Sequence, residues 1–230
     1  MTIAATPETP VARRLLTLAS GLVLVAVGVA LMIRAEIGVA PYDVLTTGVA
    51  EATGLEIGLA AMLLPLVFTL GGWALGRRPG PGTVLAVLLV GPILGAVLRL
   101  VPESDLMAVR LPLFAVGFLA IAAGITAVIV AELGPGPAEI VMLAIHDRGY
   151  PLAATRTGIE VSCVAVGWAL GGQIGAGTVV VALLIGPVLK HLLVLAGYPA
   201  TPPPAARGTE PGEQPPTGLG EVVDGAAPGA

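Results

Sequence analysis

Apolar residues in this chain come in long runs that charged residues interrupt only sparsely. A helix that spans a membrane needs roughly 20 predominantly apolar residues. The first run follows Arg13-Arg14 and exceeds the 7–15 residues of a typical signal-peptide core, so it is interpreted as a retained span. The pattern predicts six spanning helices, at about 15–33, 57–75, 83–101, 111–131, 154–171 and 178–197.

The composition supports a membrane protein. Of the 230 residues, 56% are apolar and only 11% are charged, whereas a soluble domain carries about a quarter charged residues. Such a chain has too few polar side chains to coat a surface that faces water. A soluble enzyme, a disordered protein and a nucleic-acid-binding protein are therefore excluded, and the lipid bilayer is the expected partner.

The positions of arginine predict the orientation of the spans, because basic residues in short connections collect on the cytoplasmic side. With the N-terminus inside, the inner side holds Arg13, Arg14, Arg77, Arg78, Arg148 and Arg207. Three further arginines at outer span ends are expected to reach the lipid head groups: Arg34, Arg99 and Arg110. The C-terminus is also predicted inside, and residues 199–230, rich in Pro, Gly and Ala, are predicted to form a disordered cytoplasmic tail.

The chain contains an internal repeat. Residues 28–43 align with residues 124–139, and the matches, each 96 positions apart, include Gly28/Gly124, Glu36/Glu132 and Pro41/Pro137. A second block around Trp73 matches one around Trp168, 95 positions apart, which a deletion of one residue explains. A disordered N-terminus at 1–12 is thus expected to precede two three-span repeats, at 13–101 and 109–198.

An odd number of spans per repeat means that the second repeat begins on the opposite face of the membrane. The loop charges agree, because Arg77-Arg78 on the predicted inner side align with Gly172-Gln173 on the predicted outer side. Inverted repeats of this kind recur in secondary transporters. The predicted fold is an all-α membrane protein with six transmembrane helices, arranged as two inverted three-helix repeats that each carry a short extra interfacial or re-entrant helix.

Each repeat has a glycine–proline–acid motif directly after its first span, formed by Gly38, Pro41 and Asp43 and by Gly134, Pro137 and Glu139. Glycine accepts the positive φ that is common just past a helix end. Proline suits the first turn of a new helix, where an acid is also stabilised by the helix dipole. The motif predicts a break and then a short helix, at about 41–53 and 137–148, too short to cross a membrane.

Two interpretations of Asp43 and Glu139 are open. In the first, these acids only cap helices that lie at the membrane interface. In the second, two short helices from opposite faces present their N-termini and acids to a shared central cavity, as broken helices do in transporters. The sequence does not fix how deep the short helices sit.

Ionisable residues also lie inside two predicted spans. Arg156 and Glu160 are four residues apart in the fifth span, and Lys190 is in the sixth. Because such residues are costly in lipid, Glu160 is expected to pair with Arg156, with Lys190 or with both. The group is either a neutralised packing contact, in which Arg156 could reach the head groups, or part of a substrate or ion site. The first repeat has Ala61, Pro65 and Gly95 at the aligned positions.

Catalytic, cofactor and metal chemistry are not expected. The chain has one cysteine, Cys163, and two histidines, so the sequence predicts neither an intramolecular disulfide nor a cysteine or histidine metal cluster. It also shows no nucleophile–base pair, no metal-ligand spacing and no phosphate-binding loop.

Several motifs resemble those of bacterial membrane proteins of the YczE type, which are loosely grouped with YitT-like proteins. They are Gly-Val-Ala-Pro-Tyr-Asp-Val-Leu (38–45), Gly-Pro-Gly-Pro-Ala-Glu (134–139), Thr-Arg-Thr-Gly-Ile-Glu (155–160) and Gly-Trp-Ala-Leu-Gly-Gly-Gln-Ile-Gly-Ala-Gly-Thr (167–178). The resemblance covers about residues 14–196. Family members usually have Pro-Trp-Asp in place of Pro41-Tyr42-Asp43, and often Pro-Arg-Asp in place of Pro137-Ala138-Glu139. The resemblance implies a multi-pass protein of the bacterial inner membrane and no particular activity.

Two functions of different classes fit these features. The first is a transporter or permease for an unidentified small molecule or ion, whose candidate site contains Asp43, Glu139, Arg156, Glu160 and Lys190. The alternative is a non-transporting membrane protein with a regulatory or scaffolding role. Acids and bases open to a cavity would favour the first function, whereas charges paired within a dry bundle would favour the second.

Overall fold

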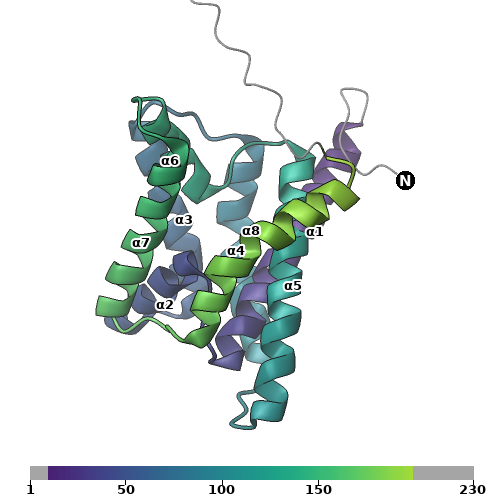
Figure 1. The fold of residues 1–230 in the computed structure, drawn as a ribbon, viewed down its shortest axis with the longest axis vertical. Coiled ribbons are helices and arrows are strands. Elements are labelled where there is room, and N and C mark those ends of the chain that lie inside the picture. Colours follow the sequence, from purple (N-terminus) through teal and green to yellow (C-terminus); the bar gives the residue numbers. More distant parts are fainter. Residues whose placement is uncertain (1–9, 199–230) are drawn as a thin grey trace, which may run out of the picture. The chain divides into compact units, whose positions relative to one another are not determined.

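The computed structural model describes residues 10–198, which form helices and no strand (Figure 1). The helices are α1 (Val11–Ala35), α2 (Pro41–Thr53), α3 (Ile57–Ala74), α4 (Pro81–Leu100), α5 (Met107–Ala131), α6 (Pro137–His146), α7 (Leu152–Ala169) and α8 (Ala176–Leu195). The predicted tail at 199–230 lies outside the described residues. The predicted disordered N-terminus at 1–12 also lies outside them up to residue 9, but residues 11 and 12 belong to α1.

Within residues 10–198, five helices are long and apolar enough to cross a membrane: α1, α3, α4, α5 and α8. The chain is therefore an all-helical membrane protein with several spans. Helix α7 has 18 residues and lies where the fifth span is predicted, but it is not among these five. Its first half carries Arg156 and Glu160, which make it less apolar, so its crossing stays a prediction.

The two short helices α2 and α6 follow the breaks that the sequence predicts. Pro41 and Pro137 stand in their first turns, and Gly38 and Gly134 have φ angles of 133° and 123°. The residue just past each preceding helix, however, is a glutamate in the left-handed region, Glu36 (φ 52°) or Glu132 (φ 51°). The expectation that glycine takes this position is wrong. In each half, the glycine follows two residues later.

Helices α1 and α5 form the most extensive helix pair, and they cross at glycines. A Cβ atom on Gly28 would lie 2.6 Å from the Gly117 carbonyl oxygen, and one on Gly124 would lie 2.7 Å from the Gly21 carbonyl oxygen. Contacts between 21 and 124 and between 28 and 117 require the helices to run antiparallel. Because Gly28 aligns with Gly124 and Gly21 with Gly117, exchanging the two halves converts each contact into the other.

Two ion pairs join the halves in the same reciprocal way. Arg110 Nη2 lies 2.6 Å from Glu36 Oε2, and Arg14 Nη2 lies 4.0 Å from Glu132 Oε2. Arg14 also donates a 2.6 Å hydrogen bond to the Glu132 backbone carbonyl. Arg14 and Arg110 are 96 positions apart, as are the two glutamates. Each arginine therefore holds the left-handed residue that ends the first helix of the other half.

The three arginines expected to reach the lipid head groups form ion pairs with carboxylates. Arg34 pairs with Glu103, Arg99 pairs with Glu56, and Arg110 pairs with Glu36 and Asp105. Acids on neighbouring segments lie within reach of each guanidinium group, and contact of these arginines with the head groups stays a prediction.

The non-helical turn after the first helix of each half is hydrogen-bonded to the first turn of the last helix of the other half. The Gly82 amide donates a 2.8 Å hydrogen bond to the Leu133 carbonyl, and the Gly177 amide donates a 2.9 Å hydrogen bond to the Ile37 carbonyl. Each short helix also packs on a helix of the opposite half: α2 packs on α7, and α6 packs on α3. At one of these contacts Gly72 lies against Ile140.

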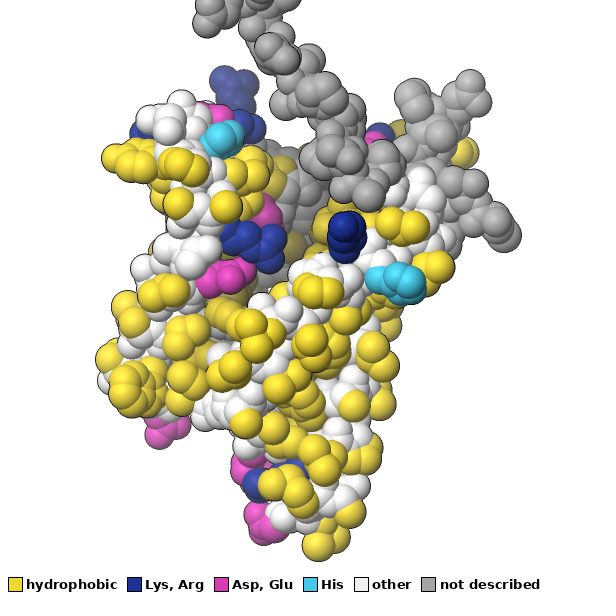
Figure 2. Space-filling view, in the orientation of Figure 1, with side chains coloured by type: hydrophobic (Ala, Val, Ile, Leu, Met, Phe, Trp, Pro, Cys, Tyr) yellow, Lys and Arg dark blue, Asp and Glu magenta, His cyan; other side chains and the backbone are white. Residues whose placement is uncertain are grey.

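The buried core lies around the α1–α5 crossing and includes Met32, Val39, Val44, Leu94 and Val181. Hydrophobic side chains also cover large parts of the visible outer face in Figure 2. Exposed apolar area on this scale marks a surface that contacts lipid or protein. Trp73 and Trp168 are 57% and 67% exposed, as the amphipathic ring of tryptophan suits a membrane interface.

We predict that Gly28→Ala lowers the free energy of unfolding by about 1–3 kcal/mol, because the new methyl group would overlap the α5 backbone. Thermal unfolding in mild detergent, followed by size-exclusion chromatography, measures the effect. Gly71→Ala in α3 is the control, since a Cβ atom there meets nothing within 4 Å. A Gly28→Ala protein as stable as the Gly71→Ala protein would contradict the packing described.

Candidate functional site

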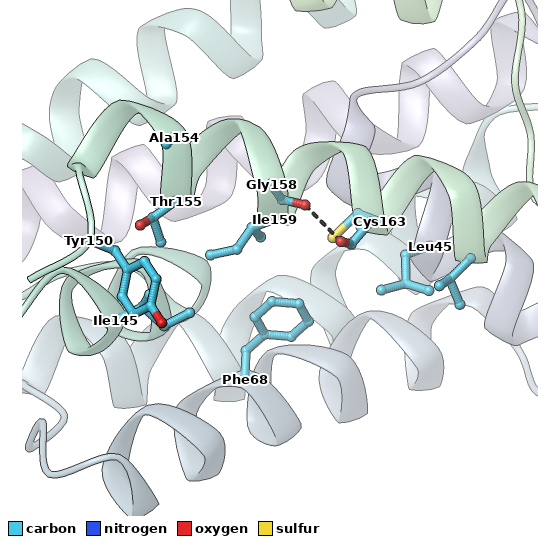
Figure 3. Close-up of a pocket in the computed structure, with 11 residues that line it drawn as sticks. Leu45, Phe68, Ile145, Tyr150, Ala154, Thr155, Gly158, Ile159 and Cys163 are labelled. Carbon is cyan, nitrogen blue, oxygen red and sulfur yellow. Dashed lines mark hydrogen bonds between the residues drawn. The ribbon is translucent and has the colours of Figure 1, made fainter. Parts of the chain in front are cut away.

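A cavity of about 500 Å³ lies between α2, α3, α6 and α7 (Figure 3). Small-molecule sites typically have volumes of about 300–1,000 Å³. Its lining residues are Leu45, Phe68, Ile145, Tyr150, Ala154, Thr155, Gly158, Ile159, Ser162, Cys163 and Val166. In Figure 3, residues of α7 form one wall, Phe68 faces them from α3, and Tyr150 and Ile145 stand at one end.

The cavity wall is mostly apolar, although it contains three residues with hydroxyl groups, Tyr150, Thr155 and Ser162. The Thr155 hydroxyl donates to the Pro151 carbonyl at 3.1 Å, and the Ser162 hydroxyl donates to the Gly158 carbonyl at 2.7 Å. Each of these donors is thus satisfied by its own helix. The cavity is suited to the apolar body of a molecule rather than to a hydrated ion.

Polar groups without a partner lie directly behind Phe68. The Tyr42 ring meets the Phe68 ring edge-on, with 5.4 Å between the centroids. The hydroxyl groups of Tyr42 and Thr69 are buried and have no hydrogen-bond partner among the described residues. A buried donor without a partner costs about 1–3 kcal/mol, and neither residue lines the cavity itself.

Acidic side chains converge on the same region. Asp43 and Glu139 are both close enough to the Tyr42 hydroxyl to act on it electrostatically, and Asp43 and Glu160 act on Cys163 in the same way. Within residues 10–198, neither Asp43 nor Glu139 forms a salt bridge. Neither Asp43 nor Glu139 is therefore paired with a described basic residue.

The two motif acids differ in their surroundings. Asp43 is half-buried in the first turn of α2. Glu139 is exposed, and its carboxylate folds back over Gly136 at the start of α6. The position of Glu139 fits a residue that stabilises its own helix N-terminus, whereas Asp43 lies deeper, beside the cavity.

The charged cluster predicted in the membrane is only partly assembled. Arg156 Nε donates to Glu160 Oε1 at 3.0 Å, an i,i+4 pair on α7. Lys190 is exposed on α8, and it forms no salt bridge within the part of the chain that the structure describes. Of the two partners considered for Glu160, only Arg156 contacts it here.

The connection from α6 to α7, which carries Tyr150, is fastened to the end of α3. Arg77 binds both carboxylate oxygens of Asp147, and Arg148 Nη1 donates to the Leu75 carbonyl at 3.0 Å. The hydrogen bonds from Arg77 hold the pKa of the Asp147 carboxyl below its usual range. This anchor fixes one end of the cavity.

Sequence reasoning missed most of the cavity. Phe68 and Ile145 are apolar residues in apolar helices, and no pattern distinguishes them from their neighbours. The reciprocal pairs Arg14–Glu132 and Arg110–Glu36 did leave a signal, because both members recur 96 positions apart. That signal is visible only once the arginines are aligned together with the glutamates.

We predict that Gly158→Leu slows the reaction of Cys163 with methyl methanethiosulfonate at least several-fold. Gly158 lines the cavity, and a Cβ atom there meets nothing within 4 Å, so the larger side chain fills the cavity without displacing the backbone. Mass spectrometry of the detergent-solubilised protein gives the rate. Gly186→Leu on α8, also in open space, is the control; equal rates for the two variants would show that Cys163 is not reached through the cavity.

The sequence was also compared with those of known proteins. The chain is 28% identical over 181 residues to an uncharacterized protein of Haemophilus influenzae, covering 78% of this chain and 83% of the relative. It is also 28% identical over 178 residues to the uncharacterized membrane protein YczE of Bacillus subtilis, covering 76% and 82%. No solved structure matches the chain.

These relatives confirm the resemblance to YczE-type proteins, and with the apolar helices they identify a multi-pass membrane protein. The model of a family of unknown function (DUF6198) matches residues 12–193. The chain belongs to the DUF6198 family.

Proposed function

We propose that this protein is a permease for a small amphiphilic molecule, built from two inverted three-span repeats in the bacterial inner membrane. The observation that carries the proposal is the reciprocity of the contacts between the halves. In the proposed topology α7 is the fifth span, and both termini lie in the cytoplasm.

Three sets of contacts support the inversion. Helices α1 and α5 occupy aligned positions yet run antiparallel, as equivalent helices do when one repeat is turned over in the membrane. The Arg14–Glu132 and Arg110–Glu36 pairs exchange with each other, and so do the hydrogen bonds from Gly82 and Gly177. In transporters of this plan, the substrate site lies at the interface of the repeats, beside broken helices.

The cavity supports a substrate with an apolar body and a polar or cationic group. Phe68 and Val166 offer apolar walls. Tyr42, whose ring packs on Phe68 and whose buried hydroxyl has no described partner, and its neighbour Asp43 supply polar groups behind that wall. A regulatory or scaffolding protein needs neither a cavity nor such polar groups beside it, so these features favour transport. The proposal assigns no catalytic step to the protein.

We expect Asp43→Asn and Glu160→Gln to reduce uptake of ethidium into DNA-loaded proteoliposomes at least five-fold, because each substitution removes an acidic group near the cavity. The fluorescence of ethidium bound to the enclosed DNA reports uptake. Glu56→Gln is the matched control, since Glu56 is exposed and pairs with Arg99 at the far end of α3. Undiminished uptake by Asp43→Asn would remove Asp43 from the site.

The inverted topology makes a separate prediction. In a Cys163→Ala background, Arg78→Cys should react with a membrane-impermeant maleimide only from the cytoplasmic side, and Ile174→Cys only from the outer side. Both residues are exposed at the ends of aligned connections. Labelling of right-side-out and inverted vesicles measures the side. Reaction of both cysteines from one side would contradict the inversion.

A further inference from the structure

In the first half, helices α3 and α4 are packed closely against each other, an arrangement that we call closed. A Cβ atom on Gly91 would lie 2.5 Å from the Gly58 carbonyl oxygen and 2.8 Å from Met62 Cβ, and one on Gly95 would lie 3.4 Å from Gly58 Cα. Contacts between 58 and 95 and between 62 and 91 show that the two helices run antiparallel along glycine-rich faces. Small residues allow this close approach in a membrane.

The aligned pair in the second half, α7 and α8, is open. The two helices make almost no contact in the described part of the chain. Gly186, which aligns with Gly91, has nothing within 4 Å of a Cβ atom, whereas Gly91 abuts α3. Figure 1 shows α7 and α8 diverging from their connection, and Figure 2 shows the visible face hollowed between them.

The α1–α5 crossing, the two arginine–glutamate pairs and the Gly82 and Gly177 hydrogen bonds obey the exchange, so we interpret this difference as a difference of state between two similar modules. We infer that α8 is a gate that closes onto α7 as α4 is closed onto α3, that α4 then opens from α3, and that a Lys190–Glu160 ion pair holds the closed form. This inference rests on the proposed function, because exchange of states between inverted repeats is how such a protein exposes one site to both sides.

In the register of the closed pair, Lys190 and Glu160 would face each other with an offset of about seven residues, roughly 10 Å along the helix axis, which two long extended side chains can span. Lys190 aligns with Gly95, which faces α3. Glu160 aligns with Pro65, which shares a helix face with Gly58 and Met62 because these positions are three and four residues apart. Side chains lean toward the N-terminus of their own helix, so on antiparallel α7 and α8 the two side chains lean toward each other. Lys190 of α8 thus stands in place of Gly95, the small residue at which α4 packs against α3.

Asp43 and Glu139, the acids of the two glycine–proline–acid motifs, also differ between the packed half and the open half. In the proposed topology α6 begins at the inner side, where α7 and α8 stand apart, and its acid Glu139 is exposed. Helix α2 begins at the outer side, where α3 and α4 are packed, and its acid Asp43 is half-buried. The structure therefore has the arrangement of a protein that is open to the inside and closed to the outside.

Spin-label distances in the full chain, reconstituted in liposomes with Cys163→Ala, test the inference. One label pair is Tyr150→Cys with Leu195→Cys, and the aligned pair is Leu55→Cys with Leu100→Cys. We expect each pair to show a short and a long distance, with the inner pair mostly long and the outer pair mostly short. A single distance for the inner pair would overturn the inference.

The ion pair is tested on the same labelled proteins. Lys190→Met and Glu160→Gln should each reduce the fraction of short inner distances at least five-fold, and the double variant should reduce it no further, because both remove the same interaction. His191→Gln, an exposed neighbour on α8, is the control and should leave the fraction unchanged. Additive losses, or no loss, would overturn the role of the pair.

These measurements separate this inference from the proposed function, because they require no substrate. Two exchanging distances in a protein that takes up neither ethidium nor the anion 8-anilinonaphthalene sulfonate would support the gate and count against the permease. Uptake by a protein with one inner distance would support the permease and overturn the gate.

Discussion

The structure depends on the close antiparallel crossing of α1 and α5. At Gly21, Gly28, Gly117 and Gly124 the backbones are so near that a side chain would overlap the opposite carbonyl. In lipid no hydrophobic force drives helices together, so van der Waals contact between small surfaces supplies much of the attraction. Because the four glycines form two exchangeable pairs, this one contact also fixes how the second half is turned relative to the first.

Several other contacts between the halves accompany that crossing. Arg14 contacts Glu132 and Arg110 contacts Glu36, and these contacts hold two left-handed glutamates, a conformation that costs about 1–3 kcal/mol for a residue other than glycine. The turns that follow rest on the first turns of α4 and α8. The breaks that release α2 and α6 are therefore held by the opposite half, and neither half is complete without the other.

Where the halves differ, the difference is chemical as well as geometric. Gly95 is replaced by Lys190, and Pro65 by Glu160, on the faces that close in one half and stand apart in the other. A glycine contact favours one closely packed arrangement, because its attraction is lost as soon as the helices separate. An ion pair between long side chains acts over a greater distance and can be exchanged, since Glu160 already has Arg156 as a second partner.

The sequence by itself determined the membrane class, the positions of the helices and the motif that starts α2 and α6, because these depend on local composition and on the backbone limits of proline. It also revealed the repeat, since aligned residues are visible without coordinates. Only the tertiary structure decided that Glu36 rather than Gly38 takes the left-handed position, that Phe68 faces a cavity, and that Lys190 lies apart from Glu160. Those outcomes depend on the distances between helices that are far apart in the sequence. The sequence also does not distinguish an apolar residue that faces lipid from one that faces a neighbouring helix or a cavity.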